Sequence, residues 1–461
     1  MSLIDRIFRR QSAPTPAQHR RSFDAATGGR RASQFRAFGS TATETLAAGP
    51  TLRSRARHAY GNSAWVRNAV DAIVAEIVGA GITATSAHPD TDQRQALDAH
   101  FAARSVELDA EGRTDLAGLT AAMVRAEIVD GEAFALIEDG PEGVRLRLIP
   151  AEQIDESKTA DLADGGYIAG GIEFTAEGTR RAYHIFPRRP TDVFSTASQP
   201  VRIRADNVLH LFRPLGPGQA RGVSQLAPVL LTLADLDGLL DALLTGAKIA
   251  ACHAGWIRNL NDLGAGGTFD AEPEDDVSLE PGVVRRLGPG EEITFNSPAE
   301  AKDSVAFARL TLQQIAAGLG VPEHLCHGDL SNANYSSLRA GLLPFRAKCE
   351  QFSRHTLAPQ FLNPVWRRVI TAEYVARRID LPDLEPALRV TWIPPEHRQV
   401  DPAKSVDATA KLLELGLMSR REAAAKRGLD VADLDAEIAA DRERETDLGL
   451  TFSNGESTDA E

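Results

Sequence analysis

The stretch that decides the fold runs from Ala308 to Ile370, ARLTLQQIAAGLGVPEHLCHGDLSNANYSSLRAGLLPFRAKCEQFSRHTLAPQFLNPVWRRVI, and it predicts two helices separated by a polar tip. Apolar residues recur at three- and four-residue spacing in its first part, so the first helix has one apolar stripe. Gly320, followed by Pro322, is a typical helix end. The ten residues GDLSNANYSS then favour turns. A second apolar run begins at Leu338, and its three prolines predict a kinked or segmented helix.

Length and composition place the chain among ordinary soluble proteins. It has 461 residues, of which 43% are hydrophobic and 25% charged, enough for roughly two to four domains. No uninterrupted apolar run approaches the length of a membrane span, and the first residues lack the apolar core of a signal peptide. The three cysteines, Cys252, Cys326 and Cys349, are odd in number and far apart, which indicates reduced thiols in a cytosolic setting.

The N-terminal part of the chain divides into an arm and a mixed α/β region. Residues 1–50 are basic and rich in Ala, Ser, Thr and Gly, which predicts a flexible arm. In one interpretation this arm contacts partner molecules, and in the other it is a disordered tail. Helical patterns follow up to Asp130, with a turn near 111–113, and then short strands joined by Gly, Pro and Asp. Two histidines in apolar strands, His184 and His210, are expected to be packed in the core rather than to bind a ligand.

The middle of the chain begins with the string PGQARGVSQLAPVL at residues 217–230. Leucines at helical spacing continue it for about seven turns, so a helix some 35–40 Å long is expected, with Ser224 as its N-cap. Residues 270–276 are acidic and irregular; they lack an EF-hand pattern, which favours a solvated loop over a metal site. The segment LEPGVVRRLGPGEEITFNSP then predicts short strands joined by Pro-Gly turns.

Several of these strings together resemble the lambda-type portal proteins of tailed phages. The resemblance is carried by GLGVPEHLCHGDLSNANYSSLRAGLLPFR, by P-G-Q-x-R-G-V-S-x-L-A-P-V-L, and by the strand motifs GEAFALIE, LRLIPAEQI, AYHIFP and VLHLFRP. It spans roughly residues 50–445 and preserves the order of the motifs. The N-terminal arm is poorly matched.

The resemblance implies an α+β portal fold with a mixed α/β wing, long stem helices, a small β-containing clip, a kinked channel helix and a helical C-terminal crown. The implied parts, in chain order, are the arm 1–50, the wing 51–222, the first stem helix 223–252, the clip 253–298, the second stem helix 299–320, the tunnel loop 321–337, the kinked helix and return to the wing 338–398, the crown 399–447 and an acidic tail 448–461.

In such a fold the tunnel loop faces a DNA channel, and the resemblance places five residues there: Asp329, Ser331, Asn332, Asn334 and Tyr335. Short polar side chains exchange hydrogen bonds with water and phosphate easily, which suits sliding contact. An ordinary exposed turn fits the same residues equally well. Two arginines early on the next helix, Arg339 and Arg346, either meet phosphates or pair with carboxylates of a neighbouring subunit, and the second is favoured.

The resemblance also implies partners. A homo-oligomer, a ring of 12 copies, would surround double-stranded DNA at one capsid vertex of the virion after assembly in the host cytoplasm. Its clip would meet the terminase large subunit and then the head–tail adaptor, and other contacts would involve the major capsid protein and scaffold. The clip candidates are Asp275, Asp276, Arg285, Arg286, Glu291 and Glu292. No membrane, metal or cofactor is implied.

The net charge of −13 is unusual for a protein that grips DNA, which normally offers a basic face to the phosphates. An acidic channel wall would instead keep a duplex centred and unbound. The other interpretation is that the charge keeps a soluble protein dispersed.

Enzymatic alternatives rest on one cluster, His324, Cys326 and His327 beside Asp329. A cysteine with a histidine base could make a hydrolase, although the partners in such enzymes normally come from distant segments. Zinc at the same cluster would need a fourth ligand. The chain has no phosphate-binding loop, H-E-x-x-H or G-x-S-x-G motif, so it is expected not to be an enzyme. A different neck ring of the virion is a further alternative, for which the chain is large.

Overall fold

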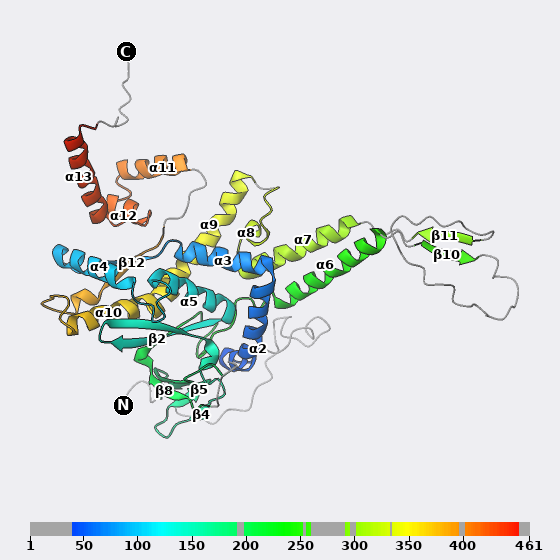
Figure 1. Ribbon diagram of the computed structural model, residues 1–461, viewed down its shortest axis with the longest axis horizontal. Coiled ribbons are helices and arrows are strands. Elements are labelled where there is room, and N and C mark those ends of the chain that lie inside the picture. The colour runs from blue at the N-terminus through cyan, green and yellow to red at the C-terminus, as the bar shows by residue number, and fades with distance from the viewer. Residues whose placement is uncertain are drawn as a thin grey trace, which may run out of the picture.

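The computed structural model describes residues 39–190, 198–251, 255–259, 291–295, 301–331, 334–395 and 402–450. The body consists of helices packed on a small antiparallel sheet, with a second sheet beneath it (Figure 1). Its N-terminal helices are α2 (Thr41–Asn62), α3 (Ala64–Val78), α4 (Thr91–Ser105) and α5 (Leu116–Asp130). Together these elements confirm the expected α+β class and the helical interpretation of residues 90–130.

The first sheet has the strand order β3-β2-β9, with strands β2 (Glu132–Gly140), β3 (Gly143–Ile149) and β9 (Val208–Phe212). In its central strand, Phe134 lies opposite Ile149 on one side and His210 on the other. The second sheet is an antiparallel meander of β4 (Ala160–Asp161), β5 (Tyr167–Ala169), β6 (Ile172–Phe174), β7 (Arg180–Ile185) and β8 (Val201–Arg204). A separate pair joins β1 (Thr83–Ser86) to β12 (Val390–Ile393), so the predicted late strand returns to the body.

Two apolar clusters hold the body together. The larger one joins α2–α5, one face of the first sheet and the helical run from residue 335 to residue 375. Trp366 is fully buried in it. The smaller one lies between the two sheets and contains Phe134, Tyr183 and Ile185. Burying these side chains contributes roughly 1.5–3 kcal/mol each. Both predicted core histidines, His184 and His210, are buried, as expected.

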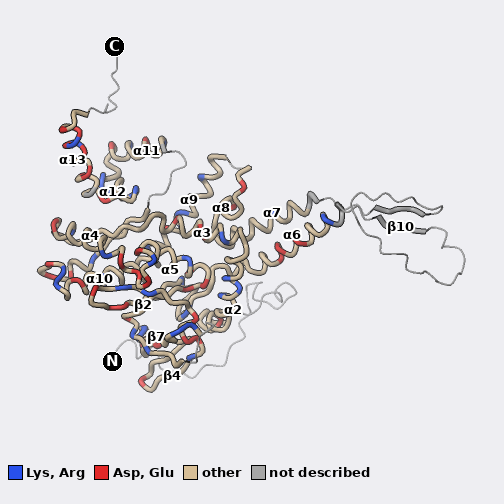
Figure 2. Tube along the Cα trace, in the orientation of Figure 1, with Lys and Arg blue, Asp and Glu red and all other residues tan. Residues whose placement is uncertain are grey.

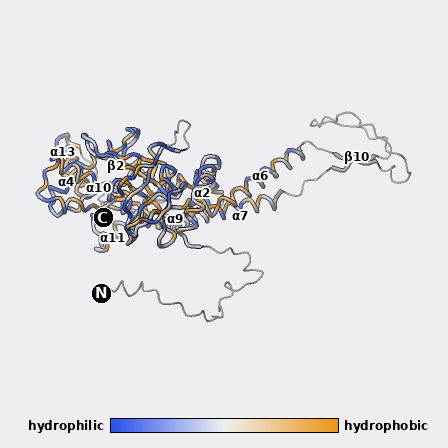
Figure 3. Tube along the Cα trace, turned by 90° about the horizontal axis from the view of Figure 1, so that it is seen from below, coloured by the Kyte–Doolittle hydropathy of each residue, from blue (hydrophilic) through white to orange (hydrophobic). Residues whose placement is uncertain are grey.

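A two-helix hairpin projects from the body (Figure 1). It is formed by α6 (Leu230–Ala251) and α7 (Ala301–Leu319), which pack along each other near the body, where Leu233, Leu236 and Ile315 are buried. Its far end carries the antiparallel pair β10 (Gly255–Asn259) and β11 (Glu291–Phe295). Apolar residues continue along both helices beyond the body (Figure 3).

The long helical run that follows the polar tip is segmented, as its prolines predict. It consists of α9 (Tyr335–Phe352), a π-helical segment (Ser353–Leu362) and α10 (Asn363–Val375). Pro359 lies inside the π-helical segment and has no N–H to donate, which interrupts the α-helical ladder. The N–H of Asn363 accordingly bonds the carbonyl of Ala358, five residues back.

Three helices, α11 (Pro402–Glu414), α12 (Arg420–Ala425) and α13 (Val431–Leu448), form a separate C-terminal group (Figure 1). Ser419 caps α12 by accepting a hydrogen bond from Glu422 N, as serine commonly does at the start of a helix.

Two expected boundaries were wrong. The helix α2 begins at Thr41, so the last ten residues assigned to the arm are helical; Pro50 lies on an exposed position of α2, while Thr45, Gly49 and Arg53 are buried. The helix α6 begins at Leu230 rather than after Ser224. Ser224 instead forms a turn, donating to Ile128 O and accepting from Leu226 N, and Pro228 restricts the helix from starting earlier.

Candidate functional site

The tip between α7 and α9 is anchored on the body at its base. Gly320 has φ +73°, which ends α7 in the left-handed region that glycine adopts readily. The next residues form the short helix α8 (Glu323–His327). Asn68 on α3 donates to the carbonyl of Leu325 at 2.8 Å, and Cys326 is buried against α3. This short helix was not anticipated from the sequence.

Beyond α8 the chain turns back through hydrogen bonds of its own polar side chains. Hydrogen bonding by the side chain of Ser331, and then by its backbone N–H, lowers the pKa of the Asp329 carboxyl. Ser331 N donates to Asp329 Oδ1 at 2.9 Å. Asn334 and Ser337 form a reciprocal capping box at the start of α9, with N···O distances of 2.8 and 3.0 Å. The tip therefore has a defined exit into α9, and its polar side chains are exposed.

Four of the five residues predicted for the tunnel loop lie together at this tip, and Asn332 is outside the described residues. Tyr335 is the first residue of α9, 38% exposed, with the ammonium of Lys404 from α11 5.3 Å from its ring centroid. No residue in the first two turns of α9 is buried, and Tyr335, Arg339 and Ala340 are among the exposed ones, so this surface can contact something outside the chain.

The two arginines named with the tip differ in environment. Arg339 is exposed on the first turns of α9. Arg346 is partly buried, and its Nε donates to Glu76 Oε1 of α3 at 2.9 Å. Arg346 thus has a carboxylate partner within its own chain, whereas the sequence favoured a partner on a neighbouring subunit.

The clip candidates lie largely beyond the described part of the chain. Asp275, Asp276, Arg285 and Arg286 are outside it, and Glu291 and Glu292 belong to β11 at the far end of the projecting hairpin.

The surroundings of Cys326 bury its thiol and do not activate it as a nucleophile. Burial raises the pKa of the Cys326 thiol to about 11, with Glu323 adding to the effect, so the thiol is protonated at neutral pH. Its Sγ donates to Trp65 O at 3.8 Å. His327 Nε2 lies 3.1 Å from Glu323 Oε1. Within the described ranges no three His, Cys, Asp or Glu residues are grouped to hold a metal ion.

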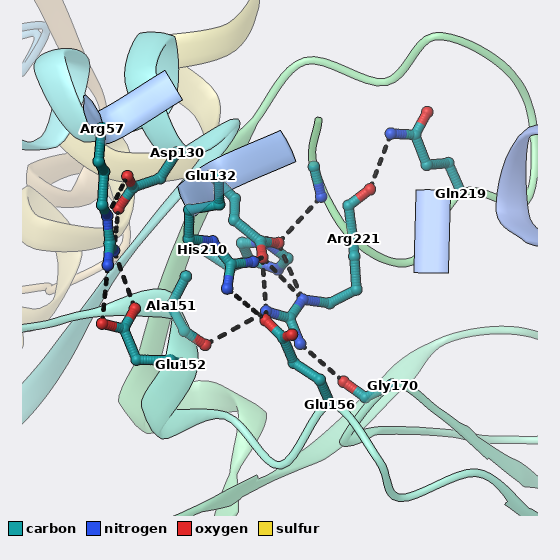
Figure 4. A network of polar contacts seen from close by, with 12 residues as sticks. Arg57, Asp130, Glu132, Ala151, Glu152, Glu156, Gly170, His210, Gln219 and Arg221 are labelled. Carbon is teal, nitrogen blue, oxygen red and sulfur yellow. Dashed lines mark hydrogen bonds and ion pairs between the residues drawn. The ribbon is translucent and has the colours of Figure 1, made fainter. Parts of the chain in front are cut away.

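A buried network of charges fixes the root of the hairpin, by which we mean the segment just before α6, where the hairpin leaves the body. Figure 4 shows this network, which sequence reasoning missed. Glu132, at the start of β2, is fully buried and accepts from Arg221 Nε (2.9 Å), Arg53 Nη2 (3.1 Å) and Gly222 N (2.9 Å). Arg221 also donates to Gly170 O at 2.9 Å and to Glu156 Oε1 at 3.0 Å. It thereby joins the second sheet and the segment before α6 to the body.

The pKa values of the buried groups in this network depend on burial and on the charges and hydrogen bonds of their partners. Burial alone would raise the pKa of Glu132, but the charge of Arg221 and the hydrogen bond with His210 reverse this and hold it well below its usual range. Burial lowers the pKa of His210 to about 4. His210 Nε2 lies 3.2 Å from Glu132 Oε2, and since the imidazole is neutral at pH 7, it donates to the carboxylate from this nitrogen.

Two glycines make the close crossing at this root possible. Gly131 has φ +93°, and a Cβ there would lie 2.2 Å from Val223 C. A Cβ on Gly222 would lie 2.0 Å from Gly131 O. The string PGQARGVS is therefore explained by backbone contact at Gly222 and by the buried guanidinium of Arg221. This string carried part of the family resemblance, but nothing in it showed that an arginine would be buried.

The structure thus has an α+β body, a projecting helical hairpin and an exposed polar tip between the hairpin and a segmented helix. The sequence model of the phage portal protein, lambda family, matches residues 28–352. Since this match covers more than half of the chain, the chain belongs to the lambda family of phage portal proteins.

Individual relatives agree with this assignment. The chain is 25% identical over 435 residues to a probable portal protein of Halomonas phage phiHAP-1, covering 89% of this chain and 83% of that one. It is 26% identical to the portal protein of Escherichia phage N15, covering 50% of this chain and 49% of the relative. For portal protein B of Escherichia phage lambda the identity is 23%, with 66% of this chain and 62% of the relative covered.

Among solved structures, a chain from the neck of an empty gene transfer agent particle, computed with C6 symmetry, matches with a TM-score of 0.49 and 17% identity, covering 82% of this chain and 93% of that chain. An HK97-family phage portal protein from Corynebacterium diphtheriae matches with a TM-score of 0.33 and 13% identity, covering 80% and 99%. Among the helices that the structure describes, none has the length and apolar character required to cross a membrane.

Proposed function

We propose that the chain forms a closed ring of 12 copies at one capsid vertex, and that the bore of this ring is the passage for double-stranded DNA during packaging and ejection. Membership of the portal family is the starting point. The observation that carries the proposal is the polar tip between α7 and α9, which is held at its base by α3 and exposed at Asp329, Ser331 and Asn334.

The tip is proposed to face the bore. Asp329, Ser331, Asn332, Asn334 and Tyr335 would meet the duplex through polar groups that exchange hydrogen bonds easily with water and phosphate. The net charge of −13 is consistent with a wall that repels the phosphates and leaves the duplex free to slide. Arg339, exposed one turn further on, would contact passing phosphates or a neighbouring subunit.

The far end of the hairpin is proposed as the clip. Residues 253–298, with Asp275, Asp276, Arg285, Arg286, Glu291 and Glu292, would meet the terminase large subunit during filling and the head–tail adaptor afterwards. The wing would contact the major capsid protein and scaffold. In this proposal the protein acts in the virion after assembly in the host cytoplasm, and it has a structural rather than a catalytic role, consistent with the protonated thiol of Cys326.

Electron microscopy of the purified chain tests the ring and the position of the tip together. In a Cys252→Ser background, Asp329→Cys is labelled with maleimide gold; Cys326 and Cys349 are buried and should remain unlabelled. We expect rotationally symmetric annuli with gold at the central hole. A matched label at Val106, 65% exposed at the end of α4, should appear at the periphery.

Two outcomes would overturn the proposal. One is a chain that stays monomeric at all concentrations and salt conditions tested. The other is an annulus in which the Asp329→Cys label lies on the outer rim.

A further inference from the structure

The imidazole of His327 lies where the polar tip leaves α8. The backbone N–H of Asp329 donates to His327 Nδ1 at 2.9 Å. Because a backbone amide can only donate, Nδ1 carries no hydrogen, and the ring is the tautomer with its hydrogen on Nε2. That nitrogen lies 3.1 Å from Glu323 Oε1, one turn back on α8. The ring thus offers one acceptor to the loop and one donor to a carboxylate.

Glu323 extends this contact to the projecting hairpin. Its carboxylate accepts from Gln313 Nε2 at 3.1 Å and from Arg309 Nε at 3.4 Å, both on α7. Burial alone would raise the pKa of this carboxyl, but the hydrogen bonds with His327, Gln313 and Arg309 lower it. From residue 304 to the end of α7 there is no acid, and Figure 2 shows none along the coloured part of this helix. That stretch of α7 therefore stabilises the charge of Glu323 and adds no carboxylate to oppose it.

The other described contacts of the tip do not attach its first residues to the rest of the chain. Ser331 N bonds Asp329 Oδ1 inside the loop, so this contact shapes the loop without fixing its direction. The capping box of Asn334 lies at the exit of the tip, on α9. Gly328, directly before Asp329, has φ +74°, and glycine tolerates many backbone conformations. The direction in which the loop leaves α8 therefore depends on a side-chain contact.

We propose that His327 is the positioning residue of the polar tip, which it ties to Asp329 through Nδ1 and to α7 through Glu323. Because α7 belongs to the hairpin, the loop follows the hairpin as well as α3, where Asn68 holds the carbonyl of Leu325. The inference rests on the proposed function and deepens it, since it names the side chain that keeps the proposed DNA-facing groups in place.

Two amide variants of His327 separate its two contacts. Asparagine places an amide oxygen where Nδ1 lies and can still accept from Asp329 N, but it does not reach Glu323. Glutamine places its amide near the position of Nε2 and can still donate to Glu323, but it leaves Asp329 N without this acceptor. Both variants remove the imidazole ring, so a loss of packing alone would affect them similarly.

A nitroxide label at Leu330→Cys, a site 54% exposed, measures the mobility of the tip by electron paramagnetic resonance. The label is placed in a full-length Cys252→Ser chain, in which the two remaining cysteines, Cys326 and Cys349, are buried. A matched label at Val375→Cys, 74% exposed on the body, should be unaffected by any change at His327.

We expect His327→Gln to raise the ratio of mobile to immobile label at residue 330 roughly 2- to 10-fold, which is the effect of losing one ordinary hydrogen bond. His327→Asn keeps the bond with Asp329 and should raise this ratio by less than about twofold. An unchanged ratio in His327→Gln, or equal increases in the two variants, would overturn the proposal.

A double-mutant cycle tests the connection through Glu323. Glu323→Ala removes the carboxylate that orients the ring, so it should also raise the mobile fraction. Combined with His327→Gln it should add little, because both changes act on one contact. Fully additive effects would show that Glu323 and His327 hold the tip independently, which would contradict the connection to α7.

The label measurement does not require a ring, so it fails separately from the proposed function. If annuli carry gold at the central hole but His327→Gln leaves the label unchanged, the ring is real and the role given to His327 is wrong. If His327→Gln loosens the tip as expected but the gold lies on the outer rim, His327 positions the tip and the proposed function falls.

Discussion

Glu132 is the residue on which most of the buried polar contacts at the hairpin root converge. Its carboxylate is fully buried between two guanidinium groups and an imidazole. Taking such charges out of water is costly, and the network is stable only while every member keeps its partners. Removing one partner therefore leaves the remaining charges buried and uncompensated.

We expect Glu132→Gln to lower the free energy of unfolding by about 3–5 kcal/mol, because Arg53 and Arg221 would then share Glu156 alone. Urea denaturation checks this. The matched control is Asp206→Asn, which removes the same charge from a pair with Arg204 whose side chains are 70% and 75% exposed; it should cost less than about 1 kcal/mol. Similar losses in the two variants would contradict the structural role given to Glu132.

The cysteines give a second test at the residue scale. Burial raises the pKa of Cys326 to about 11 and that of Cys349 to about 12, so less than about 1% of either thiol is ionised at pH 8. In a Cys252→Ser chain we expect no thiol to react with Ellman's reagent in the folded state and two to react in guanidinium. Rapid reaction of a single thiol in the folded chain would instead revive a nucleophilic role for Cys326.

At the scale of elements, Glu127 lies where α5, the segment before α6 and the end of α9 meet. It is 1% exposed, with Gln225 Nε2 at 2.7 Å and Arg213 Nε at 3.3 Å. The Arg213 guanidinium in turn lies 4.0 Å from the ring centroid of Phe352, the last residue of α9. Burial raises the pKa of Glu127 to about 7, although Arg213 and Gln225 act in the opposite direction.

This raised pKa predicts how stability depends on pH. Between its unfolded value of about 4.5 and its folded value of about 7, the folded state binds more protons than the unfolded state. The contribution of Glu127 to stability therefore falls as pH rises through this window, by up to about 1.4 kcal/mol per pH unit. Glu127→Gln should remove this fall in urea titrations from pH 4.5 to 7.5. Glu142→Gln, with a side chain 78% exposed, should retain it, and an unchanged slope in Glu127→Gln would refute the assignment.

The elements differ in how far the sequence predicted them, for physical reasons. Helical periodicity and the prolines identified α7 and the segmented run from α9 to α10, and the predicted turn near 111–113 falls between α4 and α5. The start of α6 was misplaced because a serine before an apolar run satisfies local capping rules, while its hydroxyl in the fold bonds Ile128 O, 96 residues away in sequence. The short α8 was missed because its five residues carry too little periodic signal.

The site shows the same limit. The exposed tip was predicted because turn-forming residues between two helices are a local feature. The charges at Arg53, Glu132, Glu156 and Arg221 were not predicted, because they pair across segments that only the folded chain brings together. Arg53 and Glu156, for example, are 103 residues apart in sequence. The partner of Arg346 was missed similarly, since Glu76 lies 270 residues away in sequence.

At the scale of the whole molecule, the body and the C-terminal helical group are joined by few contacts. None of the residues 402–450 belongs to either apolar cluster of the described chain. Among the described residues, the contacts with the body include Lys404 above the ring of Tyr335. They also include the turn at Arg427 and Gly428, which lines a cavity of about 400 Å³ beside α4 and α5. An exposed cation–π contact contributes only about 0.5–1 kcal/mol.

A chain that ends at Pro395 should therefore keep the stability of the body, with a free energy of unfolding within about 1 kcal/mol of the full chain. All four tryptophans precede that point, and the buried Trp366 reports on the body in urea unfolding followed by fluorescence. The matched control is a chain ending at Arg389, which also removes β12 and its pairing with β1 and should unfold at distinctly lower urea. If both truncations destabilise the body equally, the C-terminal helices contribute to its core in a way that their exposed surfaces do not indicate.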